Sequence, residues 1–134
     1  MGERMIWGRD ESEWNELVQA TTEFLAEQAR LQRTTTYTEL NSVLQRRTGA
    51  HPFDFSKDGD RAAMGALLGE VARAQLPIVC ALVSSIVLSL NENDAGGGFY
   101  RLATDLKLLP PHPTADQRLV FWSSQLATTY AHYA

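Results

Sequence analysis

The hydrophobic and polar positions between Arg61 and Ser85 predict a helix that leads into a buried strand. Four apolar residues recur at helical spacing and predict one buried stripe: Met64, Leu67, Leu68 and Val71. A second face of the same helix carries only small residues: Ala62, Gly65, Ala66 and Gly69. Because glycine destabilises a helix by up to ~1 kcal/mol relative to alanine, two glycines on one face indicate close approach by another body. That body could be a neighbouring helix, a strand or a nucleic-acid backbone.

The flanking residues predict where this central helix begins and ends. Asp58 or Asp60 can cap its start, because a short carboxylate side chain accepts hydrogen bonds from the first backbone N–H groups. Pro77 is expected to stop the helix, because proline lacks a backbone N–H. The apolar run Ile78–Val83 then predicts a buried strand. Ile86–Leu90 follows either as its hairpin partner or as the continuation of one bent strand.

The N-terminal part of the chain predicts a loose tail over residues 1–9 and an acidic helix from Asp10 to about Leu31. Asp10 and Glu13 have the spacing of a capping box. Apolar residues fall on one side of this helix and glutamates on the other. We therefore expect it to lie on the core with a solvated acidic back, and an acidic docking surface is the alternative.

A short strand is predicted over Arg33–Tyr37, which is rich in threonine and tyrosine. A second helix is predicted to follow over Glu39–Thr48. Thr36 or Thr38 can cap this helix, and Gly49 is expected to end it.

A terminal helix is predicted to begin at a second capping box, formed by Thr114 and Gln117. Apolar residues line one of its sides: Leu119, Trp122, Leu126, Tyr130 and Tyr133. We expect this stripe to pack on the first helix. Alternatively, Trp122 and Tyr130 anchor a protein partner or a homodimer, since aromatic residues are common anchors at interfaces.

The remaining sequence offers little cofactor or metal chemistry. The glycine-rich stretch 91–98 predicts a turn or flexible loop before a short helix over Phe99–Leu106, and it lacks the spacing of a phosphate-binding loop. Cys80 is the single cysteine and is expected to be a reduced core residue. His51 has no second histidine or cysteine at ligand spacing, so we predict no metal site and no cofactor.

The length of 134 residues predicts one domain with a tail and helix over 1–31, a core over 34–109 and a terminal helix over 114–134. Hydrophobic residues make up 44% of the chain and charged residues 21%, as in ordinary globular proteins. No apolar stretch is long enough to cross a bilayer and no secretory signal precedes the first helix. The sequence thus predicts a cytoplasmic protein without membrane contact.

The formal net charge of −4 argues against tight non-specific binding to nucleic acid. The acidity is concentrated in the first helix, however. From Arg30 onward the chain carries ten Lys or Arg residues against nine Asp or Glu residues. A local basic patch is therefore compatible with the sequence, and it matters more for binding than the total charge.

Four motifs follow one another in the middle of the chain: Tyr37-Thr38-Glu39-Leu40, Ala63-Met64-Gly65, Pro77-Ile78-Val79 and Gly96-Gly97-Gly98. In this order they resemble the DNA-binding domain of the alkylguanine-DNA alkyltransferases and alkyltransferase-like proteins, over about residues 34–109. The resemblance implies an α+β, mainly helical fold. Its core would be a winged helix-turn-helix with a small β-hairpin or sheet, flanked here by additional N- and C-terminal helices. A weaker similarity is to bacterial domains with the same Tyr-x-Glu-Leu and Gly-Phe pattern.

The catalytic motif of that family does not carry over to this chain. Ala81-Leu82-Val83-Ser84 stands where the family has Pro-Cys-His-Arg, and Cys80 has no neighbouring base to activate it. Ala62 stands where the family has its base-flipping arginine, and Arg61 lies one position away. We therefore predict a protein that is not an enzyme and transfers no alkyl group.

The sequence predicts a non-enzymatic, DNA-associated protein that binds duplexes weakly and with little sequence preference, in DNA repair, defence or regulation. The expected DNA contacts are Tyr37, Arg46, Arg47, Arg61, Gly65 and Arg101. The alternative is a protein-interaction or dimerisation module on the same scaffold that no longer binds DNA. A continuous basic surface around Arg61 would favour DNA, and a neutral or apolar surface would favour a protein partner.

Overall fold

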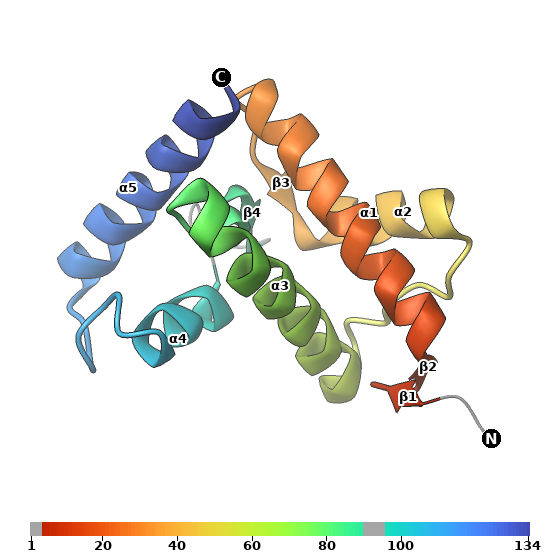
Figure 1. Ribbon diagram of the computed structural model, residues 1–134. Coiled ribbons are helices and arrows are strands. Elements are labelled where there is room, and N and C mark those ends of the chain that lie inside the picture. Colours follow the sequence, from red (N-terminus) through yellow and green to blue (C-terminus); the bar gives the residue numbers. More distant parts are fainter. Residues whose placement is uncertain (1–3, 90–95) are drawn as a thin grey trace.

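The computed structural model describes residues 4–89 and 96–134, and it shows the mainly helical α+β fold that the sequence predicts (Figure 1). Most of the predicted loop 91–98 lies outside the described residues. The helices are α1 (Glu11–Arg30), α2 (Tyr37–Thr48), α3 (Asp58–Val79), the short 3-10 helix η1 (Val83–Ile86), α4 (Gly97–Asp105) and α5 (Ala115–Tyr133). The strands are β1 (Met5–Ile6), β2 (Arg9–Asp10), β3 (Thr35–Thr36) and β4 (Val87–Leu88). Within the described residues, no helix is long and apolar enough to span a membrane.

Helix α3 runs through the middle of the molecule, with α1 and α2 to one side and α4 and α5 to the other (Figure 1). The predicted stripe Met64, Leu67, Leu68 and Val71 is buried in a main core shared with α1 and α2. A second, smaller cluster joins α3 to α4 and α5 through Ala72, Leu82, Phe99 and Phe121. The central helix therefore belongs to two cores, and its small-residue face lies outside both apart from Ala66, which is partly buried against the main core.

Residues 81–86, between the end of α3 and β4, are all buried, and α5 holds this segment in place. Two hydrogen bonds connect them: the backbone N–H of Leu82 donates to Oε1 of Gln125 over 2.8 Å, and the indole Nε1 of Trp122 donates to the carbonyl oxygen of Ser85 over 2.9 Å. Buried backbone groups need such partners, because leaving one unpaired costs about as much as a lost hydrogen bond. Helix α5 thus supplies hydrogen-bond partners to two backbone groups of this segment, which forms no long strand that could pair them.

The predicted end of the central helix at Pro77 is wrong. Helix α3 continues to Val79, and the N–H of Cys80 still donates to the carbonyl oxygen of Leu76 over 2.9 Å, which closes the last turn around the proline. The helix ends because Cys80 adopts a left-handed conformation with φ of 63°. Cys80 is exposed rather than buried in the core.

The two predicted strands after Pro77 are also wrong for most of their length. Ile78 lies on α3 and is 60% exposed, whereas the residues of η1 form a buried 3-10 helix. Among the described residues of this stretch, β4 alone is a strand, and it pairs in parallel with β3 in the register Thr35 to Val87 and Thr36 to Leu88. This short parallel pair connects the start of α2 to the end of the buried segment.

The N-terminal tail is more ordered than the sequence predicts. Strands β1 and β2 form an antiparallel hairpin, whose turn residues Trp7 and Gly8 have positive φ angles of 53° and 77°. Positive φ at both central residues is the geometry of a type I′ turn, whose twist matches that of the two strands. The capping box at Asp10 is wrong: Asp10 precedes α1 but makes no side-chain capping bond.

Some of the predicted caps of the other helices are confirmed and others are wrong. Lys57, rather than Asp58 or Asp60, precedes α3, and it offers no side-chain cap. Both predicted caps of α2 are confirmed: the hydroxyl of Thr36 accepts a hydrogen bond from the N–H of Glu39, and Gly49 ends the helix with φ of 72°. The capping box of Thr114 and Gln117 is confirmed as well.

The predicted packing of the terminal helix on the first helix is confirmed for its second half. Leu126, Tyr130 and Tyr133 pack against the main core, and the guanidinium of Arg30 on α1 lies 5.9 Å from the ring centre of Tyr133. Trp122 packs instead in the smaller cluster, and Leu119 is 55% exposed. The stripe is therefore divided between two cores and solvent.

Candidate functional site

A groove of about 870 Å³ separates α3 from α4. Fifteen residues border it: Tyr37, Arg61, Ala62, Gly65, Ala66, Leu68, Gly69, Glu70, Arg73, Ser84, Gly98, Phe99, Arg101, Leu102 and Asp105. We call it the α3–α4 groove. Its volume lies in the range of sites that hold small ligands or segments of larger ones.

The small-residue face of α3 forms one wall of this groove. Ala62, Gly65, Ala66 and Gly69 all border it, as their spacing along one helical face requires. A Cβ atom built on Gly65 or Gly69 would meet no atom within 4 Å. Packing among the described residues therefore gives no reason for glycine at either position, although each costs helix stability.

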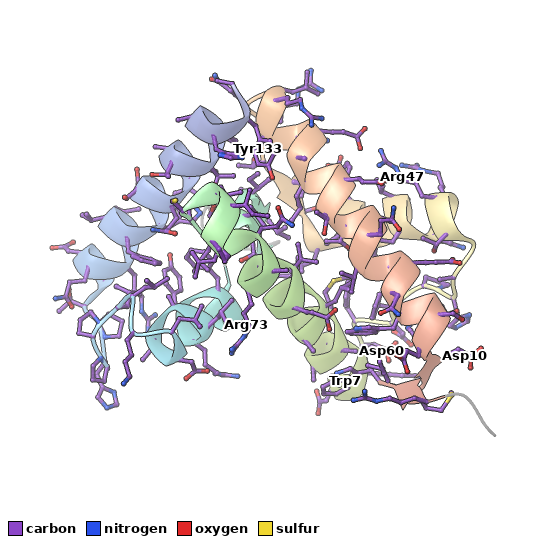
Figure 2. All side chains as sticks on the ribbon, in the orientation of Figure 1. Trp7, Asp10, Arg47, Asp60, Arg73 and Tyr133 are labelled. Carbon is purple, nitrogen blue, oxygen red and sulfur yellow. The ribbon has the colours of Figure 1, made fainter. Side chains whose placement is uncertain are left out.

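Three arginines border the groove, and they differ in whether their guanidinium groups are already hydrogen-bonded or ion-paired. The guanidinium of Arg61 donates to the carbonyl oxygen of Phe55 over 2.6 Å and pairs with Asp58. Arg73 and Arg101 form no ion pair with any carboxylate that the structure describes. Figure 2 shows the side chain of Arg73 pointing from α3 towards α4. Two of the three cations are thus available to an anionic ligand.

Two carboxylates also border the groove, so its charge is only slightly positive. Glu70 is held by α1, because the indole Nε1 of Trp14 donates to its Oε1 over 3.1 Å. Asp105 lies one turn after Arg101 on α4. A ligand in the groove would meet paired and unpaired charges of both signs rather than a uniform basic surface.

Tyr37 reaches the groove from the start of α2. Its ring packs edge-on against Phe55, with ring centres 6.4 Å apart and an interplanar angle of 75°. The hydroxyl lies 3.4 Å from the position that a Cβ on Gly96 would occupy, so glycine at 96 leaves room for it. Burial raises the pKa of the Tyr37 hydroxyl, because the anionic form is poorly solvated there.

Ser84 contributes a buried polar group to the wall. Ser84 is 5% exposed, and its Oγ, like that of Ser85 beside it, has no hydrogen-bond partner among the described residues. Gly98, in the first turn of α4, borders the same groove, and a Cβ built there would meet no atom within 4 Å. Unsatisfied buried hydroxyls are uncommon and call for a physical reason.

Four of the six predicted DNA contacts meet in the α3–α4 groove: Tyr37, Arg61, Gly65 and Arg101. The other two, Arg46 and Arg47, lie in the last turn of α2 and do not border it. Arg47 pairs with Glu27 of α1 over 2.6 Å, beside α1 and away from α4 (Figure 2). The four predicted arginines therefore do not form one continuous surface.

Sequence reasoning missed four polar residues of the groove: Glu70, Arg73, Ser84 and Asp105. Arg73 could have been found, because it follows Gly69 by four positions and so extends the small-residue face by one turn. Ser84 could not, since its position depends on a buried segment that the sequence predicts as strand. Among residues 4–89 and 96–134, no group of three His, Cys, Asp or Glu side chains is placed to hold a metal ion.

Comparison of the chain with protein-family models, with curated proteins and with solved structures gives no significant match in any of the three.

Proposed function

We propose that the chain binds duplex nucleic acid weakly through the α3–α4 groove, without catalysis. The observation that carries the proposal is the pair of glycines on α3, Gly65 and Gly69, which face open space beside arginines. A helix with no side chains on one face lets a partner's backbone come close, and the guanidinium groups of Arg73 and Arg101 can then contact phosphate oxygens.

The proposal includes a winged-helix type of fold, in which α2 and α3 would be the two helices of a helix-turn-helix. The order of α2, α3 and a small sheet supports it. The connection between the two helices spans residues 49–57, which is longer than the ~3–4-residue turn of the common motif. A role in DNA repair, defence or regulation remains part of the proposal.

The charges predict how such binding behaves. Phosphate contacts position a protein on a duplex and carry little sequence information, so affinity should depend weakly on base sequence. Two or three contacts would give a salt dependence with a slope of about −2 to −3 in log–log form, at ~0.9 per neutralised phosphate. The net charge of −4 should keep the affinity low at moderate salt.

Fluorescence anisotropy with a short labelled duplex tests the proposal. Arg101→Gln and Tyr37→Phe should weaken binding at low salt while circular dichroism shows an intact fold. Arg46→Gln is the matched control, because Arg46 is exposed but does not border the groove. Absence of binding at low salt, or equal binding by all variants, would refute the proposal.

The proposal excludes alkyl transfer because Cys80 is not among the residues that border the groove. Incubation with alkylguanine-containing DNA should leave the intact mass of the protein unchanged. A stoichiometric alkyl adduct on Cys80 would contradict this part of the proposal.

A protein-interaction module is the second candidate, and one surface favours it. Leu119 and Val120 on α5 are 55% and 69% exposed. Val120 borders a shallow, mainly apolar depression together with Leu109, Pro110 and Phe121. Trp122 and Tyr130 are half-buried inside the fold, so a partner on α5 would contact Leu119 and Val120 first. Light scattering of the parent and of Val120→Lys would reveal such an interface if it joins two copies.

A further inference from the structure

We propose that Asn41 is a positioning residue for duplex binding, because it fixes the loop that holds the guanidinium of Arg61 at the edge of the α3–α4 groove. Asn41 lies on α2, is half-buried and is not among the residues that border the groove. It therefore acts on a ligand only through other residues. The role rests on the proposed function, since the position of Arg61 matters to a duplex only if the groove binds one.

The side chain of Asn41 pairs with the backbone of the loop that joins α2 to α3. Its Nδ2 donates to the carbonyl oxygen of Phe53 over 2.8 Å, and the N–H of Phe53 donates to its Oδ1 over 2.9 Å. One amide side chain thus engages both backbone groups of a residue twelve positions away, as the facing residue of an antiparallel strand would. Phe53 is buried, and the guanidinium of Arg9 lies 4.3 Å from its ring centre. This point of the loop is therefore held by α2 and by the N-terminal hairpin.

Phe55, two residues further along the loop, carries the contact to the groove. Its carbonyl oxygen accepts from Nη1 of Arg61 over 2.6 Å. Its ring packs edge-on against Tyr37, which lies one turn before Asn41 on α2. The loop is thus attached to α2 at two points, and the direction of the Phe55 carbonyl follows from them.

A further hydrogen bond holds the residue between these two points. The N–H of Asp54 donates to Oδ2 of Asp60 on α3 over 2.6 Å, but this bond is exposed to solvent. The two bonds of Asn41 are partly buried. Because a hydrogen bond is electrostatically stronger where water is excluded, we expect Asn41 to hold the loop more firmly than Asp60 does.

The hold on Arg61 prepares it for a phosphate. A guanidinium has five N–H donors, and Arg61 bonds only to the Phe55 carbonyl and to Asp58 among the described residues, so further donors remain for a ligand. A long side chain that is already ordered loses less freedom on binding, which raises affinity. Without the Phe55 carbonyl, Arg61 would keep its ion pair with the exposed Asp58, and exposed pairs order a side chain weakly.

Duplex binding at low salt and a double-mutant cycle test the role. Asn41→Ala should weaken binding about two- to tenfold, the range for one long side chain left unordered in the free protein. Because Asn41 acts through Arg61, the double variant of Asn41→Ala and Arg61→Gln should bind no worse than Arg61→Gln alone. The effect of Asn41→Ala should instead add to that of Arg101→Gln. Gln45→Ala removes an exposed amide one turn further along α2 and is the matched control, which should bind as the parent does.

Measurements on the free protein separate the loop from the fold and from the ligand. Nuclear magnetic resonance should show a shifted Nε–H signal of Arg61 in Asn41→Ala and an unchanged one in Gln45→Ala, while circular dichroism shows both folds intact. Asn41→Asp keeps the acceptor for the Phe53 N–H and loses only the donor. It takes the place of Asn41→Ala if that variant unfolds.

An Arg61 signal that Asn41→Ala leaves unchanged would refute the positioning role, whether or not a duplex binds. Equal or tighter duplex binding by Asn41→Ala, or an effect that adds to that of Arg61→Gln, would refute the role and leave the proposed function. No duplex binding by the parent would refute the proposed function and with it the role in binding. A shifted Arg61 signal would in that case still show that Asn41 sets the position of this side chain.

Discussion

Trp122 on α5 donates its indole N–H to the carbonyl oxygen of Ser85, thirty-seven positions earlier in the chain, over 2.9 Å. Ser85 lies in η1, next to the Ser84 that borders the α3–α4 groove. Gln125, one turn along α5, accepts from the backbone of Leu82 in the same buried segment. The terminal helix therefore fixes one wall of the groove although Trp122 and Gln125 do not border it.

Replacing Trp122 should destabilise the fold in two separable steps. Trp122→Phe keeps most of the apolar contact but leaves the Ser85 carbonyl without its donor, at a cost of about 1 kcal/mol for a lost hydrogen bond. Trp122→Ala also removes the ring from the smaller core and should cost ~3 kcal/mol, the lower end for large-to-alanine changes, because the side chain is only half-buried. Urea unfolding gives both values. A Trp122→Ala variant as stable as the parent would contradict this account, and a stable variant with altered oligomeric state would point to a dimer anchor.

The amphipathic helices could be predicted from the sequence because their information is local. The periodicity from Trp14 to Leu25 specifies which side of α1 is buried, and the threonine at 36 and glycine at 49 specify the ends of α2. The small-residue face of α3 could also be predicted from the sequence, because residues at helical spacing share a face wherever the helix packs.

The segment after Pro77 could not be predicted because its conformation depends on distant residues. A continuous apolar run does not distinguish a buried helix from a buried strand. Here the choice depends on Gln125, which bonds to Leu82 just before η1, and on Trp122, which bonds to Ser85 within it. For the same reason the sequence does not predict that Ser84 borders the groove. The wall that α3 forms was therefore predictable, and the wall that η1 forms was not.

Tyr37 should make the fold more sensitive to alkaline pH. Burial raises the pKa of its hydroxyl above the usual value of about 10. The folded state then holds the proton more tightly than the unfolded state. This contribution to stability is fully present below pH ~10 and is lost as the pH rises through the pKa of the folded state. Urea unfolding at increasing pH should show a shallower loss for Tyr37→Phe than for the parent.

Tyr130 provides the comparison for this titration, because burial also raises the pKa of its hydroxyl. Tyr37→Phe should therefore remove only part of the alkaline sensitivity, and the double variant with Tyr130→Phe should remove more. Identical profiles for the parent and Tyr37→Phe would show that Tyr37 does not contribute.

Cys80 ends α3 in a conformation that suits glycine better than cysteine. Its φ of 63° lies in the left-handed region, which costs a residue with a Cβ roughly 1–2 kcal/mol. Its side chain is exposed, so little packing is lost on its removal. Cys80→Gly should raise the free energy of unfolding by about 1 kcal/mol after the added freedom of the unfolded chain is subtracted. Cys80→Ala keeps the Cβ and is the control, and an equal gain from alanine would rule out the backbone explanation.

Gly65 and Gly69 offer the sharpest test of why α3 carries a bare face. A Cβ at either position meets no atom within 4 Å, and alanine is favoured over glycine inside a helix. Gly65→Ala and Gly69→Ala should each stabilise the fold by up to ~1 kcal/mol. If the bare face serves a partner, the same changes should weaken duplex binding, and Gly65→Leu should weaken it more because its side chain would fill part of the groove. Gly49→Ala is the control of opposite sign, since φ at Gly49 is 72° and alanine there should destabilise the fold. Stabilised alanine variants that bind duplex as well as the parent would show that these glycines serve no contact with nucleic acid.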